Sequence, residues 1–180
     1  MQVTILPACA PRAKPGWPGN ASERSVVVSV FHTTRRIAFA PEYLLAIVAD
    51  VARYPEFLPL CTGASVWDAK DLGDGRRSFR ASLDIEYPKL RLRETFVSDV
   101  LVDPGRRTIR ATSSEGPVRH IDNRWLFSQA RGGCDIDFHL DYQMSSRVLH
   151  MAMGSVFEFA VRKVMTAFEE RAHALEHGDT

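Results

Sequence analysis

The sequence predicts an α+β fold of the helix-grip type, in which a curved antiparallel sheet of about seven strands wraps around one long C-terminal helix. The first observation is the stretch 146–177, where apolar residues recur with helical periodicity for about eight turns. The second is a series of segments before residue 145 with strand-like composition or alternation, separated by turn signals. The two apolar faces bury each other when the sheet curls and the helix lies across its concave side.

The segment before the main run of strands contains the first predicted strand and helix. Val26–Ile37 is rich in Val, Thr and Phe, as strands are. Pro41 and Glu42 suit the first turn of a helix, and the apolar spacing predicts that this helix ends near Arg53. The next residues, Tyr54–Cys61, form an apolar stretch containing two prolines, where we expect neither helix nor strand.

Six more strands are predicted downstream, and short turns between them indicate a meandering antiparallel sheet. Arg76–Tyr87 and Cys134–Met144 alternate most strictly between apolar and polar residues, so each should have one buried face and one solvated face. The predicted strands are Ala64–Lys70, Arg76–Tyr87, Leu90–Val102, Arg107–Ser113, Arg119–Ala130 and Cys134–Met144. A helix packed on such a curved sheet often leaves an elongated apolar space, which is where we expect a ligand.

The overall composition excludes several classes of protein. The chain of 180 residues is 45% hydrophobic and 25% charged, as expected for one domain with a core. Its 23 basic and 22 acidic residues give no basic field, so we expect no DNA partner. Three cysteines without a C-x-x-C motif favour reduced thiols inside the cell. No apolar run is long enough for a transmembrane helix.

The first 25 residues differ from the rest of the chain. They contain four prolines and two glycines, which predicts a disordered leader, residues 1–25, before a folded domain at 26–177. No basic segment and no sufficient apolar run precede Cys9, which disfavours a secretion signal. A targeting segment and a misassigned start remain alternative interpretations of this leader.

The usual signatures of catalytic and metal sites are absent from the sequence. There is no nucleophile elbow, zinc-protease motif, P-loop or dinucleotide fingerprint. Their absence weakens the interpretation as an enzyme, and we assign no catalytic residue. One strand face carries a row of polar residues, but a flat row does not converge on an ion, and we expect a solvated face there, as for the pair His120 and Asp122. The row is Asp135, Asp137, His139 and Asp141.

Two polar residues fall where strand alternation predicts burial. Glu94 continues the face of Leu92 and Phe96, and Asn123 continues the face that contains Trp125. A buried carboxylate is costly unless it is paired, so one interpretation is a core ion pair, for example with Arg124. The other is that Glu94 or Asn123 hydrogen-bonds the polar head of an otherwise apolar ligand.

The segment Ala49–Cys61 resembles the signature of the coenzyme Q-binding START-like family, whose bacterial members are often named for ribosome-association toxins. The resemblance covers about residues 29–175. The segments that carry it, in order, are Thr34–Ile37, Ala49–Cys61, Arg93–Phe96, Gly116–Pro117 with His120, Asn123–Trp125 with Phe127, Asp137–Phe138, Phe157 and Ala167–Glu169.

This resemblance implies a helix-grip fold with a hydrophobic tunnel, no metal or redox cofactor of its own, and a non-enzymatic role in handling ubiquinone for respiration. It also marks a mouth or gate of that tunnel, formed by Tyr54, Pro55, Phe57, Leu58 and Pro59; a merely packed helix stop is the alternative. The expected tunnel lining combines the resemblance with the predicted apolar faces: Phe79, Leu83, Ile85, Trp125, Phe127, Phe138, Leu140, Met153 and Phe157.

Three functional hypotheses follow. The first is a non-enzymatic lipid-binding protein that holds ubiquinone or a similar prenyl lipid, contacts the membrane surface transiently and serves respiratory complexes. Such a protein would lie in the cytoplasm at the inner membrane, or in the mitochondrial matrix of a eukaryote. The second is a toxin-type protein that binds the large ribosomal subunit. The third is a cyclase or aromatase, which needs an acid and a base converging in the cavity.

Overall fold

The computed structural model describes residues 29–88 and 91–178; for residue 92 and residues 147–161 it describes the backbone alone. The described part forms one seven-stranded sheet, as predicted, with three α-helices, one more than the sequence indicates. The strands are β1 (Ser29–Ile37), β2 (Cys61–Gly73), β3 (Arg76–Tyr87), β4 (Leu92–Asp103), β5 (Thr108–Ser113), β6 (Val118–Ala130) and β7 (Gly133–Met144). The helices are α1 (Pro41–Ala49), α2 (Tyr54–Phe57) and α3 (Arg147–Glu176), with a 3₁₀ turn, η1, at Val51–Arg53. The predicted leader lies outside the described residues.

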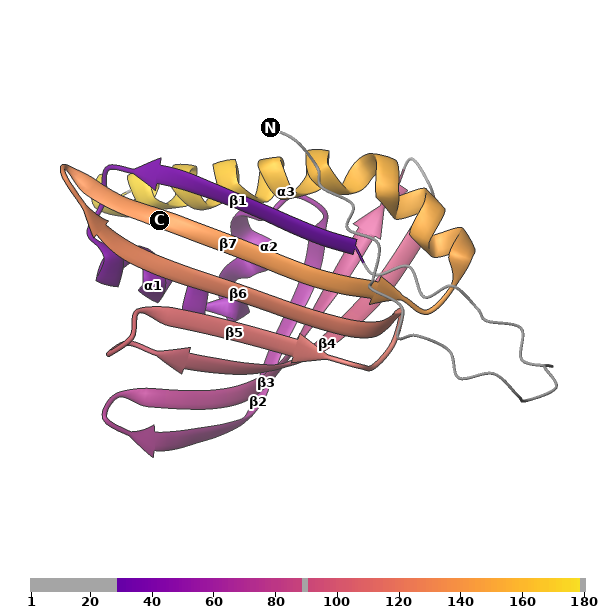
Figure 1. The fold of residues 1–180 in the computed structure, drawn as a ribbon, viewed down its shortest axis with the longest axis horizontal. Coiled ribbons are helices and arrows are strands. Elements are labelled where there is room, and N and C mark those ends of the chain that lie inside the picture. Colours follow the sequence, from indigo (N-terminus) through magenta and orange to yellow (C-terminus); the bar gives the residue numbers. More distant parts are fainter. Residues whose placement is uncertain (1–28, 89–90, 179–180) are drawn as a thin grey trace, which may run out of the picture.

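The sheet is an antiparallel meander, and the first strand of the chain forms one of its two edges. Its order is β1-β7-β6-β5-β4-β3-β2, so each strand from β2 to β7 pairs with the next, and β1 pairs with β7. The sheet curls, and α3 lies across its concave side, above α1 and α2 (Figure 1). β2 is longer than predicted, because register shifts near Cys61, Trp67 and Asp71 interrupt the alternation that a regular strand would show.

The concave face is packed to different depths along its length. Under the last turns of α3 the sheet residues are fully buried, including Phe127, Ile136 and Val102. Towards the sheet end from which α3 departs, Val118 of β6 is buried, but five other apolar residues of β3 to β6 are only half-buried. These half-buried residues are Leu83, Ile85, Phe96, Ala111 and Ile121. The hydrophobic core therefore occupies one part of the concave face, and the remaining part is less completely covered.

The C-terminal half of α3 is fastened to the rest of the fold by both apolar and polar contacts. Phe168 packs edge-on against Trp125 of β6, with ring centroids 5.6 Å apart. Tyr43 of α1 donates a hydrogen bond of 3.1 Å to the carbonyl oxygen of Ala172. Arg35 of β1 forms an ion pair with Glu169. This half of α3 thus belongs to the core, as its sequence pattern predicts.

The region after α1 differs from the prediction in one respect. α1 ends at Ala49 rather than near Arg53, and Tyr54–Phe57 forms a short helix where no helix was expected. Pro55 is compatible with this helix because it lies in the first turn, where a backbone N–H has no helical acceptor. The hydroxyl of Tyr54 donates to the carbonyl oxygen of Val48 and holds α2 against the end of α1.

The helices within the described residues include none that is long and apolar enough to cross a membrane.

Two adjacent residues of β6 test the directions in which the side chains of this strand point. Phe127 is fully buried (0% exposed), whereas Leu126 points to the outer face and is 42% exposed. Phe127→Ala should lower the free energy of unfolding by about 3–5 kcal/mol, because it removes apolar contacts and leaves a cavity. Leu126→Ala should change it by less than about 0.5 kcal/mol. Urea denaturation measures both; similar losses in the two variants would contradict the described direction of these side chains.

Candidate functional site

Asn123 is the polar residue at the centre of the concave face. In the register of the sheet it lies between Ala111 of β5 and Leu140 of β7, and Ile121 and Trp125 flank it on the same face of β6. Its Oδ1 atom is buried without a hydrogen-bond partner among the described residues. A buried polar atom that lacks a partner costs about 1–3 kcal/mol. The predicted inward position of Asn123 is confirmed, and its amide lacks the hydrogen bonding that a purely structural role would provide.

Glu94 also faces the concave side of the sheet. It lies opposite Ile85 of β3 and is half-buried. The predicted ion pair with Arg124 is wrong, because Arg124 extends from the other face of the sheet and binds Asp122. No hydrogen bond or ion pair to Glu94 is found among the described residues. The structure therefore places a carboxylate and an amide on one apolar face.

The predicted apolar lining residues divide into three groups. Phe79, Trp125, Phe127, Phe138 and Leu140 face the concave side and are buried in the core. Leu83 and Ile85 face the same side and are half-buried. Met153 and Phe157 lie on α3, where the side chains fall outside the described residues. The half-buried residues near Glu94 and Asn123 are the less completely buried part of this surface.

Four of the five predicted mouth residues surround an open groove between α2 and α3. Its volume is about 580 Å³, and it is lined on one side by Pro55, Glu56, Phe57, Leu58 and Pro59. On the other side lie Arg162, Lys163, Thr166, Ala167 and Glu170 of α3. The groove therefore combines a mostly apolar wall, which carries one carboxylate, with a charged one.

Tyr54 has a different environment from the other predicted mouth residues. It is buried, and its ring packs edge-on against Phe57 and Phe168 with centroid distances of 5.9 and 5.3 Å. Burial raises the pKa of its hydroxyl, which therefore stays protonated. Tyr54 supports the apolar wall from behind, and it does not line the groove.

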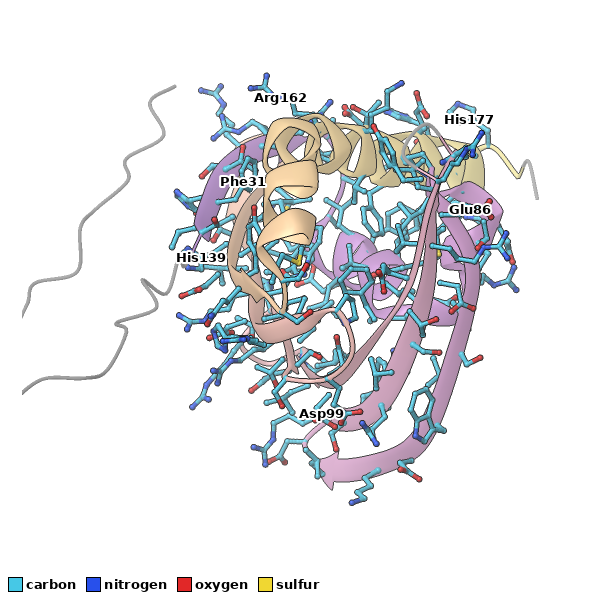
Figure 2. The ribbon with its side chains drawn as sticks, turned by 90° about the vertical axis from the view of Figure 1, so that its right-hand side faces the viewer. Phe31, Glu86, Asp99, His139, Arg162 and His177 are labelled. Carbon is cyan, nitrogen blue, oxygen red and sulfur yellow. The ribbon has the colours of Figure 1, made fainter. Side chains whose placement is uncertain are left out.

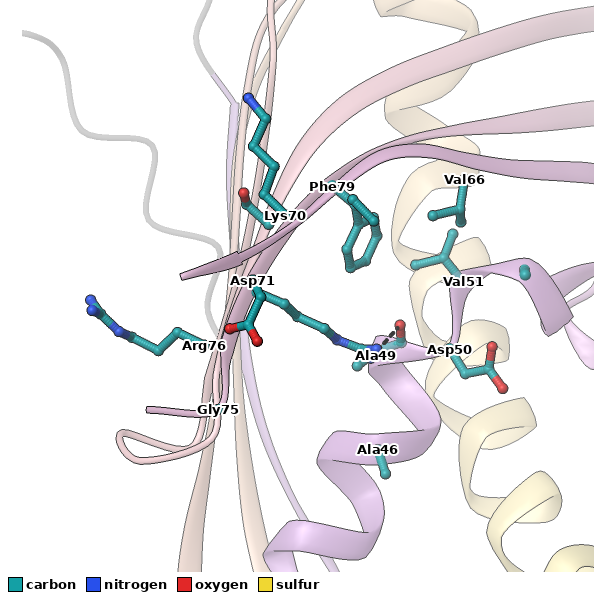
Figure 3. Close-up of a pocket in the computed structure, with 14 residues that line it drawn as sticks. Ala46, Ala49, Asp50, Val51, Val66, Lys70, Asp71, Gly75, Arg76 and Phe79 are labelled. Atoms are coloured by element: carbon teal, nitrogen blue, oxygen red, sulfur yellow. Dashed lines mark hydrogen bonds between the residues drawn. The ribbon is translucent and has the colours of Figure 1, made fainter. Parts of the chain in front are cut away.

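A second hollow, which sequence patterns do not indicate, lies between α1 and the β2–β3 hairpin (Figure 3). Its volume is about 710 Å³. The small side chains of Ala46 and Ala49 on α1 leave room for this hollow. Within it, the guanidinium group of Arg77 lies 5.8 Å from the ring centroid of Phe79. Lys70, Asp71 and Arg76 line its outer part, so this hollow is polar where it meets solvent.

The free thiols within the described chain are Cys61 and Cys134, both buried. Burial raises the pKa of Cys61, and it raises that of Cys134 to about 11. Both sulfur atoms are therefore protonated and poorly nucleophilic at neutral pH.

The outer face of the sheet holds a charged network centred on Asp122. The expectation that Asp122 is solvated is wrong, since it is 5% exposed and covered by two arginine side chains. Arg124 and Arg110 both donate to its carboxylate, and these hydrogen bonds hold the pKa of Asp122 well below its usual range. His120, by contrast, is exposed as predicted.

The polar row on β7 points outward, as predicted, and its members pair with the neighbouring strand. Arg36 of β1 donates two hydrogen bonds of 2.7 Å to Asp135, and His32 lies 2.7 Å from Asp137. Within the described chain no group of three or more potential ligands is placed to hold a metal ion. The row contributes to strand pairing between β1 and β7.

A family model described as polyketide cyclase / dehydrase and lipid transport matches residues 37–169. The chain belongs to this family. The match includes every predicted site residue from Tyr54 to Phe157.

Two curated members resemble the chain along most of its length. Ribosome association toxin RatA of Vibrio cholerae is 30% identical over 137 residues, which cover 76% of this chain and 90% of the relative. The mitochondrial coenzyme Q-binding protein COQ10 homolog B of Xenopus laevis is also 30% identical, over 79% of this chain and 57% of the relative. These relatives confirm the resemblance to coenzyme Q-binding START-like proteins.

A solved structure confirms the helix-grip architecture. A START superfamily protein from Mycobacterium smegmatis superimposes with a TM-score of 0.66, covering 81% of this chain and 98% of the other, at 21% identity. This similarity concerns the fold alone.

The Asp122 network makes a prediction about stability and pH. Asp122→Asn should lower the free energy of unfolding at pH 7 by about 1–3 kcal/mol, because it weakens hydrogen bonds to two guanidinium groups. The pKa of Asp122 is lower in the folded state than in the unfolded state, where it is about 3.9, so the ionised carboxylate stabilises the fold at pH values above the unfolded pKa. This stabilisation declines as the pH falls below that pKa. The difference in the free energy of unfolding between wild type and Asp122→Asn should therefore be constant from pH 7 to 5 and become smaller below pH 4.

Urea denaturation across that range measures the difference. Asp99→Asn is the control, because Asp99 is highly exposed and lies 3.5 Å from a single arginine, Arg80. Its effect should stay within about 0.5 kcal/mol at every pH. Equal effects of the two substitutions would contradict the assigned role of Asp122.

Proposed function

We propose that the protein is a non-enzymatic lipid-binding protein that holds ubiquinone between the concave face of the sheet and α3. The observation that carries this proposal is the unpartnered amide of Asn123 within an apolar surface. The relative named as coenzyme Q-binding supplies the class of ligand. The family name, which includes lipid transport, supports the same class.

The head group of the ligand would lie near Asn123 and Glu94. A quinone ring offers carbonyl oxygens, which accept hydrogen bonds, and the Asn123 side-chain NH₂ group can donate one. The oxygen and nitrogen of an amide exchange places by rotation, so the same side chain can present its donor to the buried position. In this orientation the amide N–H group would have a hydrogen-bond partner at the buried position.

The isoprenoid tail would supply most of the affinity. Apolar area removed from water contributes roughly 25 cal/mol per Å². The half-buried side chains of Leu83, Ile85, Phe96 and Ile121 offer such area on the same face as Asn123. The bound tail would cover residues that the described part of the fold leaves partly exposed.

The groove between α2 and α3 is the proposed place of contact with the membrane surface. Its apolar wall, formed by Pro55, Phe57, Leu58 and Pro59, suits acyl chains. Arg162 and Lys163 on the opposite wall suit anionic head groups. This arrangement favours transient, peripheral contact, and it fits delivery of ubiquinone to respiratory complexes at the inner membrane.

A cyclase or aromatase activity finds less support on this face. Such chemistry needs an acid and a base that converge on one substrate. Among the described residues of β3–β6, Glu94 is the one carboxylate that faces the concave side. A solitary carboxylate can hold a head group but does not form an acid–base pair.

Ribosome binding is the second candidate function, favoured by the similarity to RatA over 90% of that relative's length. Three arginines of the sheet are poor candidates for contacts with ribosomal RNA. Arg36, Arg80 and Arg93 each lie within 4 Å of a carboxylate, so their charges are locally neutralised.

Organic extraction of the purified protein followed by mass spectrometry tests the proposal. We expect a prenyl quinone in wild-type protein. Asn123→Leu should retain less of it, because loss of one hydrogen bond of about 1 kcal/mol weakens binding roughly fivefold. Glu94→Met should retain less of the reduced quinol form, whose hydroxyl groups can donate to the Glu94 carboxylate. Gln143→Leu is the control, since Gln143 lies on the outer face of β7.

The result that overturns the proposal is an empty wild-type protein, also after incubation with ubiquinone-containing vesicles. Unchanged quinone content in both inner-face variants would remove the assigned role of Asn123 and Glu94. Sedimentation of the quinone-free protein with large ribosomal subunits would favour the second candidate.

A further inference from the structure

Four basic side chains form a row across the outer face of the sheet, one from each of four neighbouring strands. The register places His32 of β1 opposite His139 of β7, His139 opposite Arg124 of β6, and Arg124 opposite Arg110 of β5. Residues directly opposite in an antiparallel sheet lie about 5 Å apart, and like charges at these positions destabilise the pairing. The neighbouring arginines Arg110 and Arg124 therefore need a carboxylate close to both of them.

Asp122 holds two members of this row in fixed positions. It accepts hydrogen bonds from Nε and Nη2 of Arg110 at 2.9 and 3.0 Å, and from Nε and Nη2 of Arg124. The Nη1 groups of both arginines have no hydrogen-bond partner among the described residues. Both arginine side chains are more than half exposed, so these N–H donors remain available. The buried carboxylate thus orients two guanidinium groups whose outer edges are unoccupied.

The row borders a hollow of about 520 Å³ on this outer face. Its lining includes all four basic residues together with Thr108 and the exposed side chain of Leu126. Figure 2 shows His139 on the side of the sheet that faces away from α1 and α2. The hollow is therefore separated from the concave face by the thickness of the sheet.

Three acidic residues lie near the hollow. Asp122 and Asp141 are not among its lining residues, and Asp122 is shared by two arginines, so one positive charge of the pair is not neutralised by it. Asp137 is a lining residue and lies opposite Leu126 in the register of the sheet. Its Oδ2 atom lies 2.7 Å from His32 Nε2 and accepts a hydrogen bond of 3.2 Å from Thr34, so this carboxylate is already engaged on the β1 side.

We propose that this hollow binds the phosphate group of a small phosphorylated molecule. Arg110 and Arg124 would donate to the phosphate oxygens through their free Nη1 groups, with Thr108 as an additional donor. Leu126 would contact an apolar part of the same molecule. The volume falls within the range of small-molecule sites, about 300–1,000 Å³. The site is independent of the quinone-binding proposal, because it lies on the other face of the sheet.

Titration of the full-length, ¹⁵N-labelled protein with pyrophosphate tests the proposal. We expect saturable chemical-shift changes at Thr108, Arg124, Leu126 and His139. Vesicles containing phosphatidic acid form a second arm, which distinguishes a soluble phosphate from a lipid head group. Binding of either probe through these residues supports the site and identifies the source of its phosphate.

Leu126→Glu is the decisive variant, since it places a carboxylate in the hollow without altering the hydrogen bonds to Asp122. It should weaken binding at least about tenfold through like-charge repulsion. Leu72→Glu is its control, because Leu72 of β2 has nearly the same exposure, 43% against 42%, and does not line the hollow. Arg124→Gln should also weaken binding, with folding checked by thermal denaturation. Absence of saturable binding in wild type, or equal affinity of the two glutamate variants, overturns the proposal.

Discussion

The packing of α3 on the concave face of the sheet is the interaction on which the rest of the structure depends. One face of every central strand is apolar, and this face requires a cover. Phe168 and Ala172 fill the core beneath the last turns of α3, and Arg35 and Tyr43 fasten the same half of the helix. The half-buried residues at the other end of the sheet are where the proposed ligand would lie.

The polar residues on the two faces of the sheet differ in their hydrogen bonding. On the concave face, Asn123 keeps an unpartnered amide atom among apolar neighbours. On the outer face, Asp122 is fully engaged by two arginines, and the arginines retain free donors. In both places the side chains are held by neighbouring strands while one hydrogen-bonding group remains unused. Such pre-organised groups are typical of binding surfaces, because these side chains lose little conformational entropy when a ligand binds.

Most of the fold follows from periodicity, and the finer features do not. The alternation in β3 and β7 and the helical repeat in α3 predict the layers, and the inward position of Asn123 follows from its spacing to Trp125. The short helix α2 was missed because a proline normally ends a helix, although it is tolerated in a first turn. The burial of Asp122 depends on Arg110, a residue of another strand, and strand pairing is not visible in local sequence. The spacing of Asp122 and Arg124 on one face was the available signal.

The central claim is that the concave face near Asn123 receives the head group of a quinone, and the side-chain amide of Asn123 can test it directly. The side-chain amide of Asn123 gives its own ¹⁵N–¹H signals, and these can be followed during titration with a short-chain ubiquinone. The account predicts that these signals shift together with the backbone signals of Ala111 and Phe96. Shifts confined to the outer face, with the Asn123 signals unmoved at saturation, would contradict it.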